Sequence, residues 1–181
     1  FLKIRNKEAK LIPFKINDAQ EMFEEEIKKC EEKGILKRFI VLKARQMGFS
    51  TYSEGYIFHN TTTNTFTNSM IIAHEEKATQ NLFNMSKLYY DELPVPLKPM
   101  IKYSNGKELV FENPTNDPHE KKNNPGLRSK ITVSTAGTVE VGRSATVHNL
   151  HASEVAFFPD AGTTMLGLLQ CVPDTLNSCV I

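Results

Sequence analysis

Residues 39–51 read Phe-Ile-Val-Leu-Lys-Ala-Arg-Gln-Met-Gly-Phe-Ser-Thr. The four apolar residues at the start predict a buried strand, Gly48 predicts a tight turn, and the hydroxyl pair Ser50 and Thr51 begins a helix. A strand that enters a helix through a glycine turn leaves backbone N–H groups unpaired at the helix start, and these favour a bound phosphate. This stretch therefore predicts a phosphate-binding loop in an α/β fold.

The expected loop lacks its usual lysine. P-loops commonly end in Gly-Lys-Ser/Thr, and the lysine contacts the β- and γ-phosphates. Phe49 occupies that lysine position here, and the cations at hand are Lys43, at the first position of the loop, and Arg45. Ser50 is the expected magnesium ligand. The alternative is a simple strand–turn–helix junction, in which Gly48 only makes the turn and Ser50 only caps the helix.

Length and composition limit the class of protein. The chain has 181 residues, a net charge of +1 and three cysteines without a Cys-x-x-Cys spacing. This length fits one domain with a sizeable core, and the charge predicts no global attraction to nucleic acid. The cysteines predict reduced intracellular thiols, not a disulfide framework or a zinc site. No apolar stretch approaches the ~20 residues of a membrane span. Because the chain starts at Phe1 and stops inside an apolar run at Ile181, we expect a domain of a longer protein.

Helical and strand patterns alternate along the chain. Helices are expected at 18–33, 50–60, 75–91 and 163–171, and strands at 39–42, 69–73, 109–111, 131–133 and 145–150. Asn17 or Asp18 is the expected N-cap of the first helix, and Gly34 its C-cap. Residues 113–130 predict a surface loop. The alternation predicts an α/β fold with a central, mostly parallel sheet flanked by helices.

A second informative segment lies at residues 146–159, where a predicted strand ends in Ser153-Glu154. In P-loop enzymes a strand beside the loop ends in acidic residues; one helps to hold magnesium and the next polarises the attacking water. Glu154 fits the second role, because a carboxylate can accept a proton from water. Ser153 occupies the magnesium-side position, which is usually aspartate. Glu154 alone is better explained as an exposed residue at a strand end, but the upstream loop favours a functional role.

Two further groups of residues are candidates. Gln20 can donate to and accept from an adenine edge, and Phe14 can pack on the ring, although a core phenylalanine and a solvated helix residue are the alternatives. Arg143 precedes the Glu154 strand and can neutralise charge on a transferring γ-phosphate; Arg128 and Lys130 are rival candidates, and a surface arginine is the alternative. A basic cluster in and beside the expected loop is best explained as solvent-exposed charge, and contact with a nucleic-acid backbone is the alternative. Its members are Lys121, Lys122, Arg128 and Lys130.

These segments, in this order, resemble the N-terminal ATPase domain of the tailed-bacteriophage large terminase, a DNA-packaging motor. Residues 13–20 resemble its adenine-binding Q motif, 43–51 its deviant Walker A and 153–158 its Walker B. The resemblance spans nearly the whole chain and departs from the family pattern at Phe49 and Ser153. It implies a P-loop NTPase fold of the ASCE/RecA-like kind over residues 1–181, with a C-terminal nuclease domain elsewhere in the full protein.

The resemblance also implies roles for individual residues. It implies adenine contacts from Phe14 and Gln20, and a phosphate-binding loop made of Lys43, Arg45, Gln46, Met47, Gly48, Phe49, Ser50 and Thr51. It implies catalysis by Glu154, Lys43 and Arg143, with the arginine supplied from a neighbouring subunit, and magnesium bound at Ser50, Ser153 and Glu154.

The implied activity is Mg²⁺-dependent ATP hydrolysis that drives double-stranded DNA into a procapsid. The implied partners are DNA, the portal protein, the small terminase subunit and further copies of the chain in a ring, with no membrane. The implied location is the cytoplasm of the infected bacterium, at the procapsid portal. The alternatives are a helicase-like DNA-dependent ATPase and a non-catalytic nucleotide-binding or scaffold domain.

Overall fold

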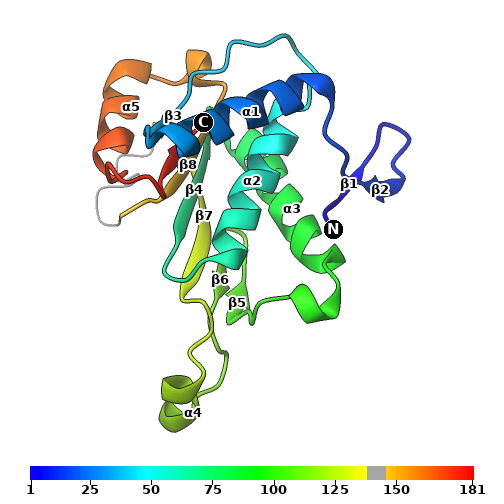
Figure 1. The fold of residues 1–181 in the computed structure, drawn as a ribbon, viewed down its shortest axis with the longest axis vertical. Helices are drawn as coiled ribbons and strands as arrows, with labels where there is room; N and C mark the ends of the chain where they lie inside the picture. The colour runs from blue at the N-terminus through cyan, green and yellow to red at the C-terminus, as the bar shows by residue number, and fades with distance from the viewer. Residues whose placement is uncertain (138–145) are drawn as a thin grey trace.

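A seven-stranded sheet forms the centre of the computed structural model, which describes residues 1–137 and 146–181 (Figure 1). Its order is β3-β9-β8-β4-β7-β6-β5. The strands are β3 (Lys37–Arg38), β4 (Asn68–Ala73), β5 (Tyr103–Ser104), β6 (Glu108–Phe111), β7 (Ser129–Thr135), β8 (Asn149–Ser153) and β9 (Cys179–Val180). The first five strands in this order are parallel, and β6 and β5 add antiparallel pairs. The predicted α/β class with a mostly parallel sheet is confirmed.

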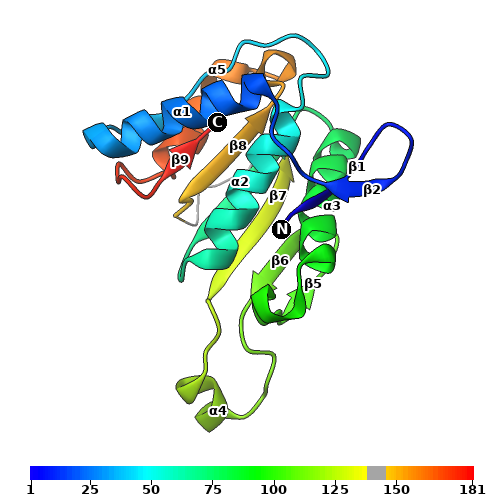
Figure 2. The same ribbon diagram turned by 45° about the vertical axis from the view of Figure 1, so that its right-hand side comes forward.

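Helices cover both faces of this sheet (Figures 1 and 2). The helices are α1 (Asp18–Lys33), α2 (Phe49–Thr63), α3 (Glu76–Glu92), α4 (Pro118–Asn123) and α5 (Ala161–Gln170), with 3-10 turns η1 (Val95–Leu97) and η2 (Val155–Phe157). Neighbouring residues of β4 reach opposite layers: Ile71 packs with Phe83 of α3, whereas Ile72 packs with Leu168 of α5. Because successive side chains of a strand point to opposite faces, a central strand between two helical layers carries apolar side chains on both faces.

Local capping defines α1. The Asn17 side chain accepts a hydrogen bond from the Gln20 N–H, and the Gln20 side chain accepts one from the Asn17 N–H. This reciprocal capping box satisfies two backbone donors at the helix start. Gly34 ends the helix in the left-handed conformation at φ 64°. The predicted bounds and C-cap are confirmed, and Asn17 is the N-cap.

The strand predicted at residues 39–42 is wrong. β3 ends at Arg38, and Ile40 and Leu42 are fully exposed. Phe39 and Val41 instead pack against the cluster of aromatic and aliphatic residues between α1 and α2. An apolar run at a sheet edge buries only the side chains that face a neighbouring layer, so a continuous run here does not mean a fully buried strand.

Other boundaries also differ from expectation. The strand predicted at 145–150 is β8, Asn149–Ser153, which begins later than expected, and its predicted end at Ser153-Glu154 is confirmed. The loop expected at 113–130 contains α4, on an arm that projects from the sheet in Figure 1. The hairpin of β1 (Lys3–Arg5) and β2 (Leu11–Pro13) has strands too short for a clear sequence pattern.

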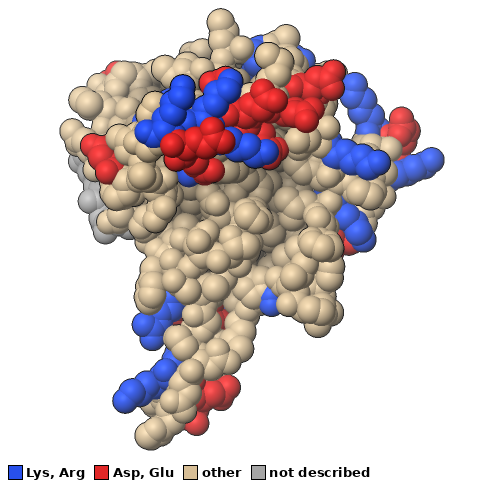
Figure 3. Space-filling model, viewed as in Figure 1, with Lys and Arg blue, Asp and Glu red and all other residues tan. Residues whose placement is uncertain are grey.

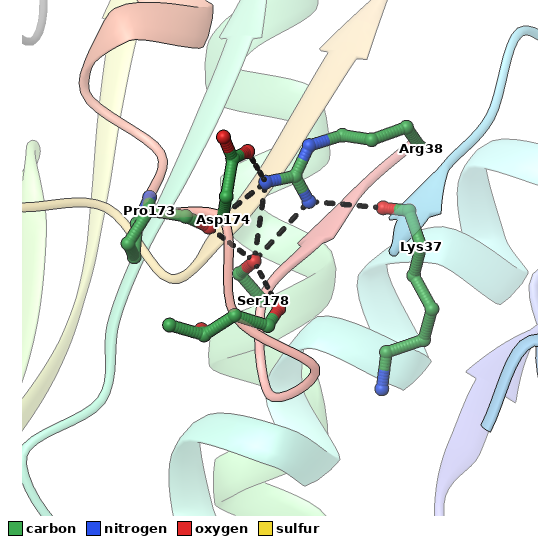
Figure 4. A network of polar contacts seen from close by, with 6 residues as sticks. Lys37, Arg38, Pro173, Asp174 and Ser178 are labelled. Carbon is green, nitrogen blue, oxygen red and sulfur yellow. Dashed lines mark hydrogen bonds and ion pairs between the residues drawn. The ribbon is translucent and has the colours of Figure 1, made fainter. Parts of the chain in front are cut away.

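A polar network anchors β3, the strand that leads into the loop (Figure 4). Arg38 donates hydrogen bonds to Ser178 Oγ at 3.2 Å and to the Pro173 carbonyl at 2.9 Å, and it lies 3.5 Å from the Asp174 carboxylate. Ser178 donates in turn to carbonyls of the same turn. The network therefore fixes the edge strand to the segment before β9.

Candidate functional site

The loop of residues 43–48 leads directly into the N-terminus of α2. Gly48 is the N-cap with φ 72°, and no described side chain caps this helix. The alternative in which Ser50 caps the helix is therefore wrong. Backbone N–H groups in the first turn of a helix have no intrahelical partner and carry partial positive charge. This helix start can bind an anion.

Two hydrogen bonds hold the loop against the start of α1. Gln20 Nε2 donates to the Gly48 carbonyl at 2.8 Å, and Asn17 Nδ2 donates to the Met47 carbonyl at 3.3 Å. In a trans peptide the N–H points opposite to the C=O of the same unit. The N–H groups of Gly48 and Phe49 therefore face away from α1. Successive backbone N–H groups in a turn can make an anion-binding concavity.

Gln20 is buried, with only 2% of its surface exposed. Its Oε1 accepts from the Asn17 N–H while its Nε2 donates to Gly48. The alternative of a solvated helix residue is wrong, because Gln20 joins the N-terminal segment to the loop. The amide keeps one further donor and one further acceptor, so the predicted adenine contact stays a prediction.

Phe14 lies against α2, where a β-carbon on Gly55 would come within 3.3 Å of its ring. The ring is half-buried and packs with the cluster between α1 and α2. Phe14 thus belongs in part to the core, and it contacts α2 beyond the first turn of that helix.

Phe49, in the usual lysine position, packs into an aromatic cluster. Its ring centroid lies 5.7 Å from that of Phe23, in an edge-on arrangement. Phe39 and Tyr52 contact the same Phe23 ring. The Phe49 side chain therefore contributes to the packing between α1 and α2, and it points away from the backbone N–H groups at the helix start.

Lys43 and Arg45 are the cations of the loop. Both are exposed, and neither makes a hydrogen bond or ion pair with another described residue. Gln46, between Arg45 and the glycine turn, has φ 63° and accepts a hydrogen bond from Lys7 at 3.4 Å. The two cations are thus available to an incoming anion.

The strand that carries the predicted acidic residue is β8. It is separated from β3 by β9, which pairs with both strands. All three strands are parallel, so the loop and Glu154 leave the sheet at the same carboxyl edge, where ligands bind in open α/β sheets. Glu154 follows β8 with φ 59° and ψ 44°, the left-handed region, and begins η2.

His74 lies beside Glu154, although no sequence motif singles it out. It directly follows β4, whose last residue, Ala73, is in register with Ser153 of β8. His74 Nδ1 is 3.2 Å from Glu154 Oε2. A search for polar residues directly after predicted parallel strands would have found it.

A buried pair of side chains, one acidic and one histidine, connects α2 to β8. His151 Nδ1 of β8 lies 2.6 Å from Glu54 Oε1 of α2, and both side chains are almost fully buried. Ser86 of α3 donates to the other Glu54 oxygen at 3.2 Å. The Glu54–His151 pair therefore fixes α2 relative to β8.

The other histidine of this segment, His148, lies before β8 and accepts a hydrogen bond from the Asn68 N–H.

The structure locates two of the three basic residues that were candidates for neutralising the γ-phosphate. Arg143 lies outside the described residues. Arg128 and Lys130 lie at the amino end of β7, and Lys130 is about 17 Å along the strand from its carboxyl end. Neither reaches the Glu154 edge within one chain. Arg128 instead stands over the Phe66 ring, 5.7 Å from its centroid.

Charges on the surface are mixed. On the face in Figure 3, basic and acidic side chains alternate along α1, where Lys28 pairs with Glu24 and Lys29 with Glu26. Lys121 and Lys122 lie on α4, next to Glu120, at the end of the projecting arm. The view offers no broad patch of one sign among the residues drawn in colour.

No protein-family model matches this chain, and no curated protein is significantly similar to it. Within the described ranges, no helix has the length and apolar character needed to cross a bilayer. In the same ranges no three or more His, Cys, Asp or Glu side chains cluster as metal ligands.

Proposed function

We propose that the chain is the ATPase domain of a viral DNA-packaging motor of the large-terminase type, with a P-loop NTPase fold of the ASCE/RecA-like kind. Hydrolysis of ATP by this domain drives double-stranded DNA into a procapsid. In this proposal the domain works in a homo-oligomeric ring with the portal protein and the small terminase subunit, in the cytoplasm of the infected bacterium.

The observation that carries the proposal is the loop at the start of α2. Gly48 adopts φ 72°, and the Met47 and Gly48 carbonyls are held by Asn17 and Gln20, so that two consecutive N–H groups face away from α1. This arrangement suits the β- and γ-phosphates of ATP. Lys43, with Arg45 as the second candidate, supplies the positive charge that Phe49 does not.

Glu154 supplies the base of the proposed reaction. Its carboxylate is about half exposed and stands at the same sheet edge as the loop, so it can meet a water molecule. It orients this water for in-line attack on the γ-phosphorus and accepts its proton, while the β–γ bridging oxygen leaves with ADP. Phosphate and ADP are the products.

Magnesium is the metal that fits these side chains, because Mg²⁺ prefers oxygen ligands. Ser50 lies at the start of α2, and Ser153 and Glu154 lie at the carboxyl end of β8, so their oxygens stand at the same edge of the sheet. Ser50, Ser153 and Glu154 would hold it, and it would neutralise charge on the phosphates.

A non-catalytic nucleotide-binding or scaffold domain is the second candidate. The packing of Phe49 in an aromatic cluster favours it, because the usual phosphate cation is missing from its position. A domain that had lost hydrolysis would have no use for the carboxylate at Glu154. A helicase-like ATPase differs from the first proposal only in its partners.

The test compares nucleotide binding and ATP turnover in the wild-type chain, Lys43→Ala, Glu154→Ala and the control Lys107→Ala, with and without double-stranded DNA. We expect Lys43→Ala to weaken binding of a fluorescent ATP analogue, and Glu154→Ala to bind normally but lose turnover. Lys107 is exposed in the turn before β6, so its variant should match wild type. Absence of turnover in wild type at high ATP and protein concentration, with DNA present, would reject the enzyme in favour of the scaffold domain.

A further inference from the structure

The carboxyl ends of β4 and β8 place two polar residues next to each other. Because Ala73 and Ser153 are in register in adjacent parallel strands, the residues that follow them, His74 and Glu154, leave the sheet side by side. The 3.2 Å between His74 Nδ1 and Glu154 Oε2 is within hydrogen-bond range.

The His74 ring packs on one side against an aromatic ring. Its centroid lies 5.5 Å from that of Phe157 in η2. The Nδ1 atom is shielded from solvent and completes no hydrogen bond with a described residue, because its approach to Glu154 is short but poorly aligned. An unpaired buried nitrogen is costly, and a small rotation of the half-exposed Glu154 side chain would provide its partner.

Glu154 itself needs a support. Its left-handed backbone is uncommon for a residue with a β-carbon, and no other described polar side chain contacts its carboxylate. A general base must hold one orientation to work efficiently, and a half-exposed glutamate otherwise samples several.

We propose that His74 is the positioning residue for Glu154, an inference that rests on the proposed ATPase function. The imidazole donates its Nδ1–H to Glu154 Oε2, while Phe157 holds the plane of the ring. One carboxylate oxygen is then anchored, and this orients the other toward the attacking water. His74 touches no substrate in this arrangement and acts only through Glu154.

Three substitutions of His74 test whether a donor at the Nδ1 position is needed. In His74→Asn the amide nitrogen takes the place of Nδ1, since both atoms are bonded to Cγ. In His74→Gln the amide nitrogen lies one bond further out, and His74→Phe keeps a ring on Phe157 without any nitrogen. We expect kcat for ATP to fall by about tenfold in His74→Phe and His74→Gln, with KM unchanged within about twofold, because orientation of a base acts on the chemical step. We expect His74→Asn to stay within about threefold of wild type, since it keeps the donor in place.

The outcomes separate the two proposals. If wild type hydrolyses ATP and His74→Phe matches it, the inference fails while the ATPase function stands. If wild type has no turnover, the proposed function fails and this inference with it. A ¹⁵N NMR measurement of the His74 ring gives a readout that needs neither turnover nor a variant. We expect the proton on Nδ1, and a ring with its proton on Nε2 alone would overturn the proposed contact.

Discussion

Gln20 Nε2 donates a 2.8 Å hydrogen bond to the carbonyl oxygen of Gly48, across 28 residues of sequence. The bond joins the first turn of α1 to the glycine that begins α2. Because the other end of the same amide completes the capping box with Asn17, the cap of one helix and the turn into the next share one side chain. The orientation of the loop backbone therefore depends on α1.

Replacement of Gly48 should disturb this contact. In Gly48→Ala, the new β-carbon would lie 2.7 Å from Gln20 Nε2, on a backbone at φ 72°. We expect a loss of about 1–3 kcal/mol in the free energy of unfolding, measured by urea denaturation, because both strain and the lost hydrogen bond contribute. The control is Gly167→Ala in α5, where a β-carbon meets nothing within 4 Å and helix propensity predicts a gain of about 0.5–1 kcal/mol. Equal stability of wild type and Gly48→Ala would contradict this loop geometry.

Restoring the common P-loop pattern should not improve binding. Phe49→Lys would place an ammonium group where an aromatic ring now packs on Phe23. We expect a loss of about 2 kcal/mol in stability and no gain in affinity for an ATP analogue, since this position faces the cluster between α1 and α2. Calorimetric melting and equilibrium binding measure the two effects. Tighter nucleotide binding by Phe49→Lys would show that the side chain can turn toward the helix start.

The Glu54–His151 pair should matter mainly for stability. Glu54→Ala leaves the His151 ring buried without its partner, and we expect a loss of about 3–5 kcal/mol in the free energy of unfolding. The matched surface change is Glu26→Ala, which removes the exposed partner of Lys29 and should leave the melting temperature unchanged within error. Similar melting temperatures for both variants would mean that the buried pair contributes no more than a surface pair.

The three thiols should differ in reactivity. Burial raises the pKa of Cys179 from 9.0 to about 12, whereas Cys30 and Cys171 are partly exposed. At pH 8 we expect two thiols to react with a disulfide reagent within minutes and the third only on unfolding, because the thiolate is the nucleophile. Cys179→Ala should remove the slow thiol alone. Fast labelling of all three in the folded chain would contradict the burial of β9.

The same pKa shift predicts a pH dependence of stability. Between about pH 9 and pH 12 the unfolded chain loses the Cys179 proton while the folded chain retains it. The unfolded state therefore binds fewer protons in this window, and the contribution of this thiol to stability decreases as pH rises. Denaturation curves at pH 8 and pH 10 should show a smaller decrease for Cys179→Ala than for wild type.

Local chemistry made several features predictable from sequence. The first helix carries its own signals in Asn17 and Gly34, whose effects act over three or four residues, and its bounds of 18–33 follow from them. The glycine turn at Gly48 and the apolar run at residues 69–73 in β4 are also set by neighbouring residues. Such local patterns of strand and helix, alternating along the chain, were enough to predict the α/β class.

Contacts between distant segments were decided by the tertiary structure. The run at 39–42 has the composition of a buried strand, but its place at the sheet edge exposes Ile40 and Leu42. The insertion of β9 between β3 and β8 depends on which strands pair, which local pattern does not encode. His74 meets Glu154 across 80 residues only because β4 and β8 are in register. Sequence alone thus determined the longer helices, several strands of the sheet and the glycine turn that begins α2, because these follow from near-neighbour interactions. Tertiary structure alone decided which side chains surround that loop and its acidic neighbour, because those contacts depend on how the strands order in the sheet.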